Sequence, residues 1–176
     1  YRYLYTSPRT ARYLGRSLQL FKEVDETWRI FVKIVKIDPK LRVLYGDNRN
    51  DELLITAVNN MMMIDEHIKS YCLSLKAKYP KLYLITDDQL FSILATMDPA
   101  RTFEKSRALF PNYTSLLFSD TDKFTTTGAS SNGEEILFSR TCSARNSLID
   151  WFKAIEVSIH ERLYSCLLYT SDAADE

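Results

Sequence analysis

Two adjacent carboxylates, Asp87 and Asp88, form the pair in this sequence that could serve general acid–base chemistry. They stand between Thr86 and Gln89, and Thr-Asp-Asp-Gln is the pattern of a capping box at a helix N-terminus. In such a box Thr86 and Gln89 would each accept a hydrogen bond from the other's backbone amide. Negative charge in the first turn also suits the helix dipole. Because the cap accounts for both carboxylates without a cofactor, we interpret them as structural.

The two histidines, His67 and His160, could in principle bind a metal or transfer protons. They fall on different expected helices, and each stands among charged neighbours, Asp65-Glu66 and Glu161-Arg162. This setting favours exposed positions on helix surfaces over a metal or acid–base role.

Further oxygen ligands flank an expected hairpin, namely Asp120, Asp122, Glu134 and Glu135. A calcium loop would need closer and more regular spacing than these residues have. Asn112-Tyr113-Thr114 matches a glycosylation acceptor, but without a secretory signal we interpret the match as a coincidence. We therefore expect no metal site.

A phosphate-binding loop would require the pattern Gly-x-x-x-x-Gly-Lys-Ser/Thr, which this sequence does not contain. The nearest segment, Gly15-Arg16-Ser17, lacks the upstream glycine and the lysine. The three cysteines, Cys72, Cys142 and Cys166, are odd in number and widely spaced, which favours a reducing setting with inert, partly buried thiols. We expect no chemistry within this segment and no catalytic residue.

The composition excludes two classes of partner. The chain has 176 residues, enough for one domain or a large part of one. Lys plus Arg and Asp plus Glu both number 23, so the sequence lacks the basic excess of a nucleic-acid binder. No apolar run approaches the length of a membrane span. We expect neither a nucleic acid nor a membrane as a partner.

Residues 1–17 show no clear periodicity, and no Met opens them, so we expect a truncated lead-in. Three arginines stand there among tyrosines and could form a patch for a nucleic acid or an acidic partner; a solvated, fraying end is the alternative. The residues are Arg9, Arg12, Arg16, Tyr3, Tyr5 and Tyr13.

The elements begin with two helices. The first carries apolar residues at spacings of three and four and ends at Asp38-Pro39. The second runs from about Asp51 to Lys78 with a nearly heptad seam, typical of a helix packed along most of its length. Three methionines, Met61 to Met63, lie in its middle; adaptable core filler is the favoured interpretation and a promiscuous groove the alternative. The two stripes are Phe21, Val24, Trp28, Phe31 and Val35, and then Leu54, Val58, Met61, Ile64, Ile68, Tyr71 and Leu75.

Tyr79-Pro80 interrupts the second helix, and residues 81–85 form a short apolar segment that could be extended. A helix follows the cap and buries Leu90, Ile93 and Leu94. Asp98-Pro99 starts another, with Asp98 as N-cap and Pro99 at the first helical position, and it ends near Phe110.

The composition changes in residues 115–140, where Thr, Ser, Gly and Asn become frequent. Asn132-Gly133 is a strong hairpin-turn dipeptide, and residues 135–139 could form the returning strand, so we expect two strands here. A last helix spans about Ser143 to Cys166. It places Leu148, Phe152, Ile155, Ile159 and Leu163 on one face, with Trp151 beside them.

The segment from Tyr79 to Leu94 reads Tyr-Pro-Lys-Leu-Tyr-Leu-Ile-Thr-Asp-Asp-Gln-Leu-Phe-Ser-Ile-Leu. It resembles Phe-Pro-Arg-Phe-Tyr-Phe-Leu-Ser-Asn-Asp-Glu-Leu-Leu-Glu-Ile-Leu of the dynein heavy-chain linker. Three more landmarks follow the family order: residues 21–29 resemble Phe-x-x-Val-Asp-x-x-Trp-Arg, residues 133–136 Gly-Glu-x-Val, and residues 151–156 Trp-Leu-x-x-Val-Glu.

Together the four landmarks cover about residues 20–163. We refer to the matching positions as the signature residues. They are Phe21, Val24, Asp25, Trp28, Arg29, Pro80, Tyr83, Thr86, Asp87, Asp88, Leu90, Ile93, Leu94, Gly133, Glu134, Trp151 and Glu156.

There are departures from the family pattern. Leu18-Gln19 stands where the family has Leu-Pro, and Thr86 to Gln89 replaces Ser-Asn-Asp-Glu while keeping the capping chemistry. The apolar residues of the outgoing hairpin strand are replaced by Thr125 to Ala129, which bears on the packing of the hairpin.

The resemblance implies a mainly α fold, an elongated helical bundle with a small antiparallel β-hairpin. It also implies a force-transmitting lever that lies across a ring of AAA+ modules and that ATP binding and hydrolysis in the ring bend and straighten. ATP and Mg would be cofactors of the parent's ring and not of this segment. The implied partners are the ring of the same chain, microtubules, and dynein intermediate and light chains. The implied location is the cytoplasm and cytoskeleton, with an axoneme of a cilium or flagellum favoured because axonemal heavy chains are more numerous.

The expected organisation is a lead-in over 1–17, a partial linker domain over 18–166 and a non-native, adapter-like tail over 167–176. A genuine acidic, disordered tail is the alternative for the last segment. A stand-alone α-helical scaffold or adaptor is the alternative function. An independent enzyme ranks third because the nucleophile, metal and phosphate motifs are missing.

Overall fold

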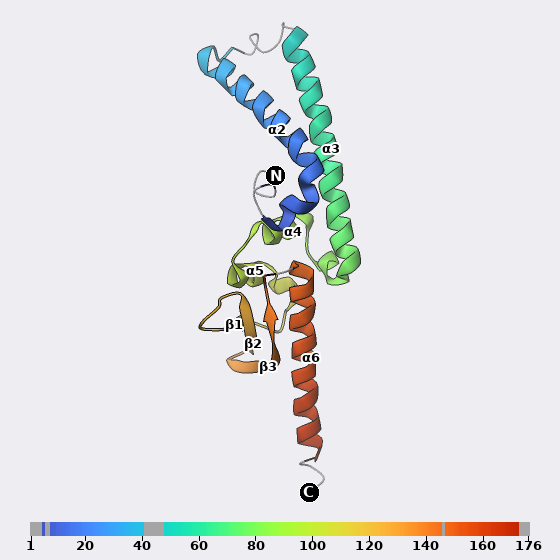
Figure 1. Cartoon of the computed structure of the whole chain (residues 1–176), viewed down its shortest axis with the longest axis vertical. Helices are drawn as coiled ribbons and strands as arrows, with labels where there is room; N and C mark the ends of the chain where they lie inside the picture. The colour runs from blue at the N-terminus through green and yellow to red at the C-terminus, as the bar shows by residue number, and fades with distance from the viewer. Residues whose placement is uncertain (1–4, 6–7, 41–47, 146, 173–176) are drawn as a thin grey trace. The chain divides into compact units, whose positions relative to one another are not determined.

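A computed structural model describes residue 5 and residues 8–40, 48–145 and 147–172 (Figure 1). The chain divides into two compact units, Tyr1–Ser74 and Leu75–Glu176, and the division falls within one long helix. Within the described residues no helix is both long and apolar enough to cross a membrane.

The first unit opens with α2, Pro8–Ile37, which begins well before the predicted start of the helix at about residue 18. Proline suits the first helical position because its fixed φ fits the helix and its missing N–H leaves no bond unmade. The buried face of this early part includes Thr10 and Ser17, which have no exposed surface, beside Leu14. Thr10 and Ser17 carry hydroxyl groups, so a search for apolar periodicity misses this part of the buried face.

The second half of α2 departs from prediction in its burial. Of the expected stripe Phe31 is buried, Phe21 and Val24 are half-buried, and Trp28 and Val35 are exposed. The exposed fraction of Trp28 is 67%. The apolar stripe exists, but the described residues cover only part of it.

α3, Asn48–Lys78, has the predicted extent to within three residues and runs antiparallel to α2 in the first unit. The Tyr13 and Tyr71 rings stack with centroids 5.2 Å apart, and the Asn60 amide donates to the Glu23 carboxylate at 3.2 Å. Burial and the nearby Tyr13 raise the pKa of Tyr71 to about 12.

The predicted seam of α3 is buried only in its second half, at Ile64, Ile68 and Leu75. Val58 is exposed, and so are all three methionines, Met61 to Met63, so the interpretation of these methionines as core filler is wrong. Three consecutive helical residues point in three directions, and in this half of α3 the described residues bury none of those directions.

The second unit begins with short helical pieces: the 3₁₀ helix η2, Pro80–Leu84; α4, Asp87–Ala95; α5, Pro99–Lys105; and the 3₁₀ helix η3, Arg107–Leu109. The possible extended segment at 81–85 is thus a 3₁₀ turn started by Pro80. The Asp98 side chain makes no capping bond; its backbone carbonyl instead accepts from the Thr102 amide at 2.9 Å and the Thr102 hydroxyl at 2.7 Å.

A three-stranded antiparallel sheet in the order β1-β2-β3 replaces the expected two-stranded hairpin. Its strands are β1, Ser115–Phe118; β2, Thr125–Ser131; and β3, Glu134–Ser143. The predicted turn is confirmed, since Asn132 and Gly133 have φ values of 50° and 90°, as a type I′ turn requires.

The Thr- and Ser-rich segment is the central strand, β2, and it buries Thr126, Gly128 and Ala129. A Cβ on Gly128 would lie 2.6 Å from the Ile136 carbonyl oxygen, so this close strand pairing requires glycine. Small residues let the neighbouring backbones approach, and the replacement of the family's apolar residues is compatible with a packed strand.

α6, Leu148–Asp172, packs against β3, and Figure 1 shows the helix alongside the sheet. It starts five residues later and ends six residues later than predicted, so it continues through Leu167 into the segment expected to be a tail. Leu148, Phe152, Ile155 and Ile159 are buried as predicted, whereas Leu163 is exposed.

The core of the second unit is an aromatic cluster. Phe152 lies at its centre, with ring centroids 5.4 Å from Trp151, 5.5 Å from Phe110 and 6.1 Å from Tyr79; Phe103 extends it through Phe110 at 5.4 Å. Aromatic rings bury large areas, so this cluster fastens α6 to the end of α3 and to α5.

Candidate functional site

The capping box at α4 is the best-defined part of the signature segment. The Gln89 amide donates to the Thr86 hydroxyl at 3.2 Å, and the Thr86 amide donates to the Gln89 side-chain oxygen at 2.9 Å. The predicted cap is confirmed. Leu90, Ile93 and Leu94 are buried behind it, also as predicted.

Asp87 and Asp88 both lie in the first turn of α4, as predicted. Both are exposed, and Asp87 binds the Lys76 ammonium group at 2.6 Å and so ties the start of α4 to the end of α3. Lys76 also lies 5.4 Å from the centre of the Tyr83 ring, and its side chain is only 13% exposed. One lysine therefore joins two signature residues, Asp87 and Tyr83.

Tyr83 itself is 64% exposed, since it lies on the outer side of η2. Pro80, which starts that turn, is exposed as well. In the first unit Trp28 is exposed, Asp25 pairs with Arg29 at 2.8 Å, and Phe21 stacks on Tyr5 at 4.7 Å. The signature residues thus include buried, half-buried and exposed positions, and Trp28 and Tyr83 are the exposed aromatic residues among them.

Two signature residues of α6, Trp151 and Glu156, contact other elements of the second unit. Trp151 is 1% exposed and donates its indole N–H to the Thr126 hydroxyl on β2 at 3.0 Å. Glu156 forms an ion pair with Lys81 of η2. Burial, together with the neighbouring Glu156 carboxylate, raises the pKa of the Tyr79 hydroxyl well above its usual range. This group is neutral at physiological pH and serves packing.

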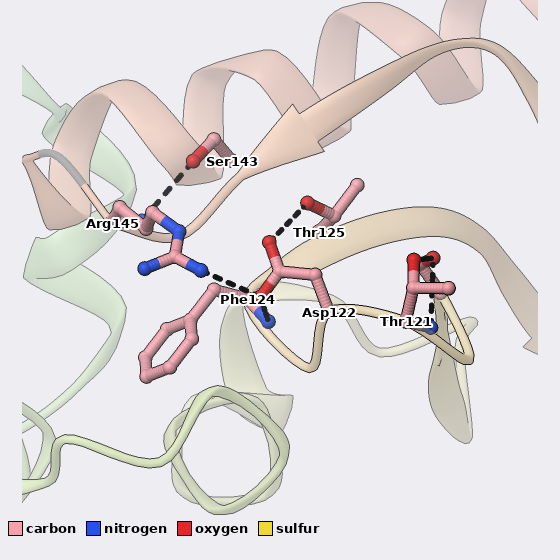
Figure 2. Close-up of polar contacts among 7 residues, drawn as sticks. Thr121, Asp122, Phe124, Thr125, Ser143 and Arg145 are labelled. Atoms are coloured by element: carbon pink, nitrogen blue, oxygen red, sulfur yellow. Dashed lines mark hydrogen bonds and ion pairs between the residues drawn. The ribbon is translucent and has the colours of Figure 1, made fainter.

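A polar cluster surrounds Asp122, in the loop between β1 and β2, and Figure 2 shows it. The Asp122 carboxylate accepts hydrogen bonds from the Thr125 hydroxyl at 2.7 Å, the Phe124 amide at 3.1 Å and the Arg145 guanidinium at 2.9 Å. The guanidinium carbon also lies 5.0 Å from the centre of the Phe124 ring. Arg145 therefore fastens the β1–β2 loop to the connection between β3 and α6.

Sequence reasoning missed this cluster. From the sequence, Asp122 was a possible calcium ligand, and no role was predicted for Arg145. Asp-x-x-Thr from Asp122 to Thr125 is a local turn signal that could have found half of it. Arg145 comes from the far end of β3, and no local pattern joins it to Asp122.

The remaining candidate ligand and binding residues do not form a common site within the described part of the chain. His67 and His160 are exposed on α3 and α6, as predicted. Among the described residues no group of three or more His, Cys, Asp or Glu side chains is placed to hold a metal. Of the turn residues, Gly133 and Glu134 are exposed. The arginine and tyrosine patch near the N-terminus lies largely outside the described residues: the structure does not describe Tyr3 or the side chains of Arg9, Arg12 and Arg16.

The cysteines are all reduced. Cys72 and Cys142 are buried and Cys166 is exposed. Burial raises the pKa of Cys142, whose sulfur lies 3.4 Å from the Ser158 hydroxyl. An open pocket of about 280 Å³ lies between α5 and β1, lined by residues that include Phe103, Glu104 and Leu116.

Comparison with known proteins gives a consistent result. The family model described as "Dynein heavy chain, N-terminal region 2" matches residues 4–169. A heavy chain of Chlamydomonas reinhardtii, "Dynein-1-alpha heavy chain, flagellar inner arm I1 complex", is 28% identical over 145 residues, 82% of this chain and 3% of the relative.

Two human proteins also match. "Dynein axonemal heavy chain 10" is 26% identical over 146 residues, 81% of this chain and 3% of the relative. "Dynein axonemal heavy chain 6" is 23% identical over 183 residues, 91% of this chain and 4% of the relative. The chain thus spans only a few per cent of the length of these relatives.

Proposed function

Because the chain belongs to the dynein heavy chain family, through N-terminal region 2, we propose that it is a force-transmitting linker segment of an ATP-driven microtubule motor. The observation that carries the proposal is the match over residues 4–169, which takes in both compact units. In this proposal the chain itself performs no chemistry. ATP and Mg act in an AAA+ ring of the parent chain.

The physical properties of the elements support the proposal. α2 and α3 are 30 and 31 residues long, so each has a continuous ladder of backbone hydrogen bonds. In the second unit, the cap, the Lys76–Asp87 pair and the aromatic cluster resist bending within the unit. A segment that transmits force needs such stiff parts.

The names of the relatives support a cellular location for the parent chain. One is assigned to a flagellar inner arm and two are axonemal. We infer that the parent of this chain works in the axoneme of a cilium or flagellum, on microtubules and with dynein intermediate and light chains.

The exposed signature aromatics offer a direct test. Trp28 and Tyr83 are 67% and 64% exposed, so replacing them leaves the interior of each unit intact. In the parent heavy chain we expect Trp28→Ala and Tyr83→Ala to slow microtubule gliding severalfold while ATP turnover continues, because force would no longer pass through the segment.

Tyr164 provides the matched control, since it is 65% exposed on α6 and lies outside the signature. Tyr164→Ala should glide at the wild-type speed. If Trp28→Ala and Tyr83→Ala also glide at that speed, the lever proposal fails and a scaffold role takes its place.

A further inference from the structure

The end of β3 presents an exposed serine beside the arginine that closes the polar cluster. Ser143 is exposed and is the last residue of β3. Its hydroxyl oxygen accepts a hydrogen bond from the Arg145 backbone amide at 3.3 Å. Figure 2 shows Ser143 beside the backbone of Arg145 and Asp122 beside its guanidinium group. A charge added to Ser143 would therefore arise next to the Arg145–Asp122 pair.

Part of the chain before Ser143 is exposed, although the two neighbours of this serine, Cys142 and Ala144, are buried. β3 pairs with β2 at Leu137 and again at Cys142, so residues 138–141 on β3 lie opposite the single residue Thr127. Within this bulge residues 139–141 are exposed. These residues lie outside the regular ladder, whereas Ser143 itself pairs with Thr125, so a kinase reaches the serine when the last pairs of β3 open.

Arg140 stands three residues before Ser143 and is exposed on this bulge. Among the described residues its guanidinium forms no ion pair with an acidic side chain. A protein kinase whose substrate groove carries carboxylates at this position would pair with it. The same arrangement, Arg-x-x-Ser, recurs at Arg162 and Ser165, but there it lies inside α6.

From these observations we propose that Ser143 is a phosphorylation site for an arginine-directed protein kinase and that its phosphate takes Arg145 away from Asp122. In the reaction the Ser143 oxygen attacks the γ-phosphorus of the kinase's ATP. An oxygen–phosphorus bond forms, the bond to the β-phosphate oxygen breaks, ADP leaves, and the serine proton passes to a carboxylate of the kinase.

Arg145 leaves Asp122 for the phosphate because the phosphate carries the larger negative charge. A serine phosphate carries between about one and a half and two negative charges at neutral pH and offers three strong acceptors, against the single charge of the Asp122 carboxylate. It also binds a guanidinium in a bidentate manner. Arg145, 62% exposed, is free to turn between the two anions.

The consequence is that the β1–β2 loop loses its side-chain tie to Arg145. Without Arg145, the Asp122 side chain keeps its local bonds to Phe124 and Thr125. The loop is then held to the connection that leads into α6 by backbone contacts, such as the bond from the Ala144 amide to the Phe124 carbonyl at 2.8 Å. Phosphorylation would thus loosen one edge of the sheet and leave the aromatic core of the second unit unchanged. This goes beyond the lever role and does not depend on it.

The first experiment is phosphate mapping. The full 176-residue chain is incubated with ATP and a purified kinase that selects arginine three residues before the serine, and sites are located by tandem mass spectrometry. We expect phosphate on Ser143, its loss in Ser143→Ala, and a large decrease in Arg140→Gln. Ser165 is the internal control, because its helical setting withholds it. Absence of phosphate on Ser143, or equal labelling of Ser165, would overturn the proposal.

The second experiment follows the loop by amide hydrogen exchange. In the phosphorylated chain the amides of Asp122, Phe124 and Thr125 should exchange about tenfold faster, because a charge-assisted hydrogen bond is lost. Arg145→Gln should exchange fast before phosphorylation and change little after it. Unchanged exchange in the phosphorylated wild-type chain contradicts the release of Arg145, whatever the Arg145→Gln variant does.

Discussion

The two tryptophans share a place in the signature and differ in environment. Sequence periodicity puts Trp28 in an apolar stripe and Trp151 beside one, yet Trp151 is 1% exposed and Trp28 is 67% exposed. The difference depends on what lies across from each face: β2 and Phe152 cover Trp151, whereas no described residue covers most of Trp28. A periodic pattern gives the direction of a side chain but not the presence of a partner, so this distinction could not be predicted from the sequence.

The contrast yields a stability prediction. Trp151→Ala should lower the free energy of unfolding of the second unit by about 3–5 kcal/mol, because it leaves a large cavity and removes the bond to Thr126. Trp28→Ala should lower stability by less than about 1 kcal/mol, because the removed ring is mostly in water already. Urea unfolding followed by far-UV circular dichroism measures both. Equal losses in the two variants would mean that the Trp28 ring is covered.

Asp122 gives a prediction about pH. Hydrogen bonds from Thr125 and Phe124, and then the Arg145 guanidinium, hold the pKa of this carboxyl below its ordinary value. A lowered folded-state pKa means that the ionised group contributes stability above the unfolded-state pKa of about 3.9. The contribution is lost as the pH falls through the folded-state pKa.

The comparison variant is Asp122→Asn, which keeps the shape of the side chain and removes its charge. The wild-type urea midpoint should exceed that of the variant at pH 7, and the gap should close as the pH is lowered below the range in which Asp122 titrates. A gap that stays constant to the acid end would show that the charge is unimportant.

At the scale of elements, prediction succeeded where a few neighbouring residues decide the structure. The cap at Thr86 and the turn at Asn132-Gly133 each depend on side chains within four positions, and both are confirmed. The start of α2 was missed because its buried face uses Thr10 and Ser17. The strand missed is β1, Ser115–Phe118, because its short apolar run has no alternation that indicates a strand.

The caps of α4 and α5 form a natural pair for a test. Thr86→Ala removes a hydroxyl that accepts the Gln89 amide and should lower the stability of the second unit by about 1 kcal/mol. Asp98→Ala removes a side chain that makes no capping bond, so its effect should be clearly smaller. Thermal or urea midpoints of the two variants decide the matter, and an equal loss would assign the Thr86 effect to something other than the cap.

At the scale of the whole molecule, contacts between residues distant in sequence were beyond prediction. Arg145 with Asp122 and Lys81 with Glu156 are opposite charges that any of many partners could have satisfied. Only the packing of α6 and the sheet selects these pairs. The candidate site was therefore predicted in its local parts, such as the cap and the turn, while the links between elements came from the structure.

The reactivity of the three thiols measures the opening of both units in one experiment. Cys72 belongs to the first unit and Cys142 to the second; they are 2% and 3% exposed, while Cys166 is exposed on α6. A disulfide reagent attacks through the thiolate, so a buried thiol reacts only when its unit opens, and burial also raises the pKa of Cys142. With 5,5′-dithiobis(2-nitrobenzoate) the native chain should show one fast-reacting thiol and two that are at least about a hundredfold slower.

Cys166→Ser should abolish the fast phase and leave both slow ones. In that background, Cys72→Ala and Cys142→Ala each leave a single slow thiol, so the remaining rate measures the opening of one unit by itself. Trp151→Ala should then speed the reaction of Cys142, because it destabilises the unit that buries this thiol. Fast reaction of two or three thiols in the native chain would mean that at least one of the two buried environments does not persist in solution.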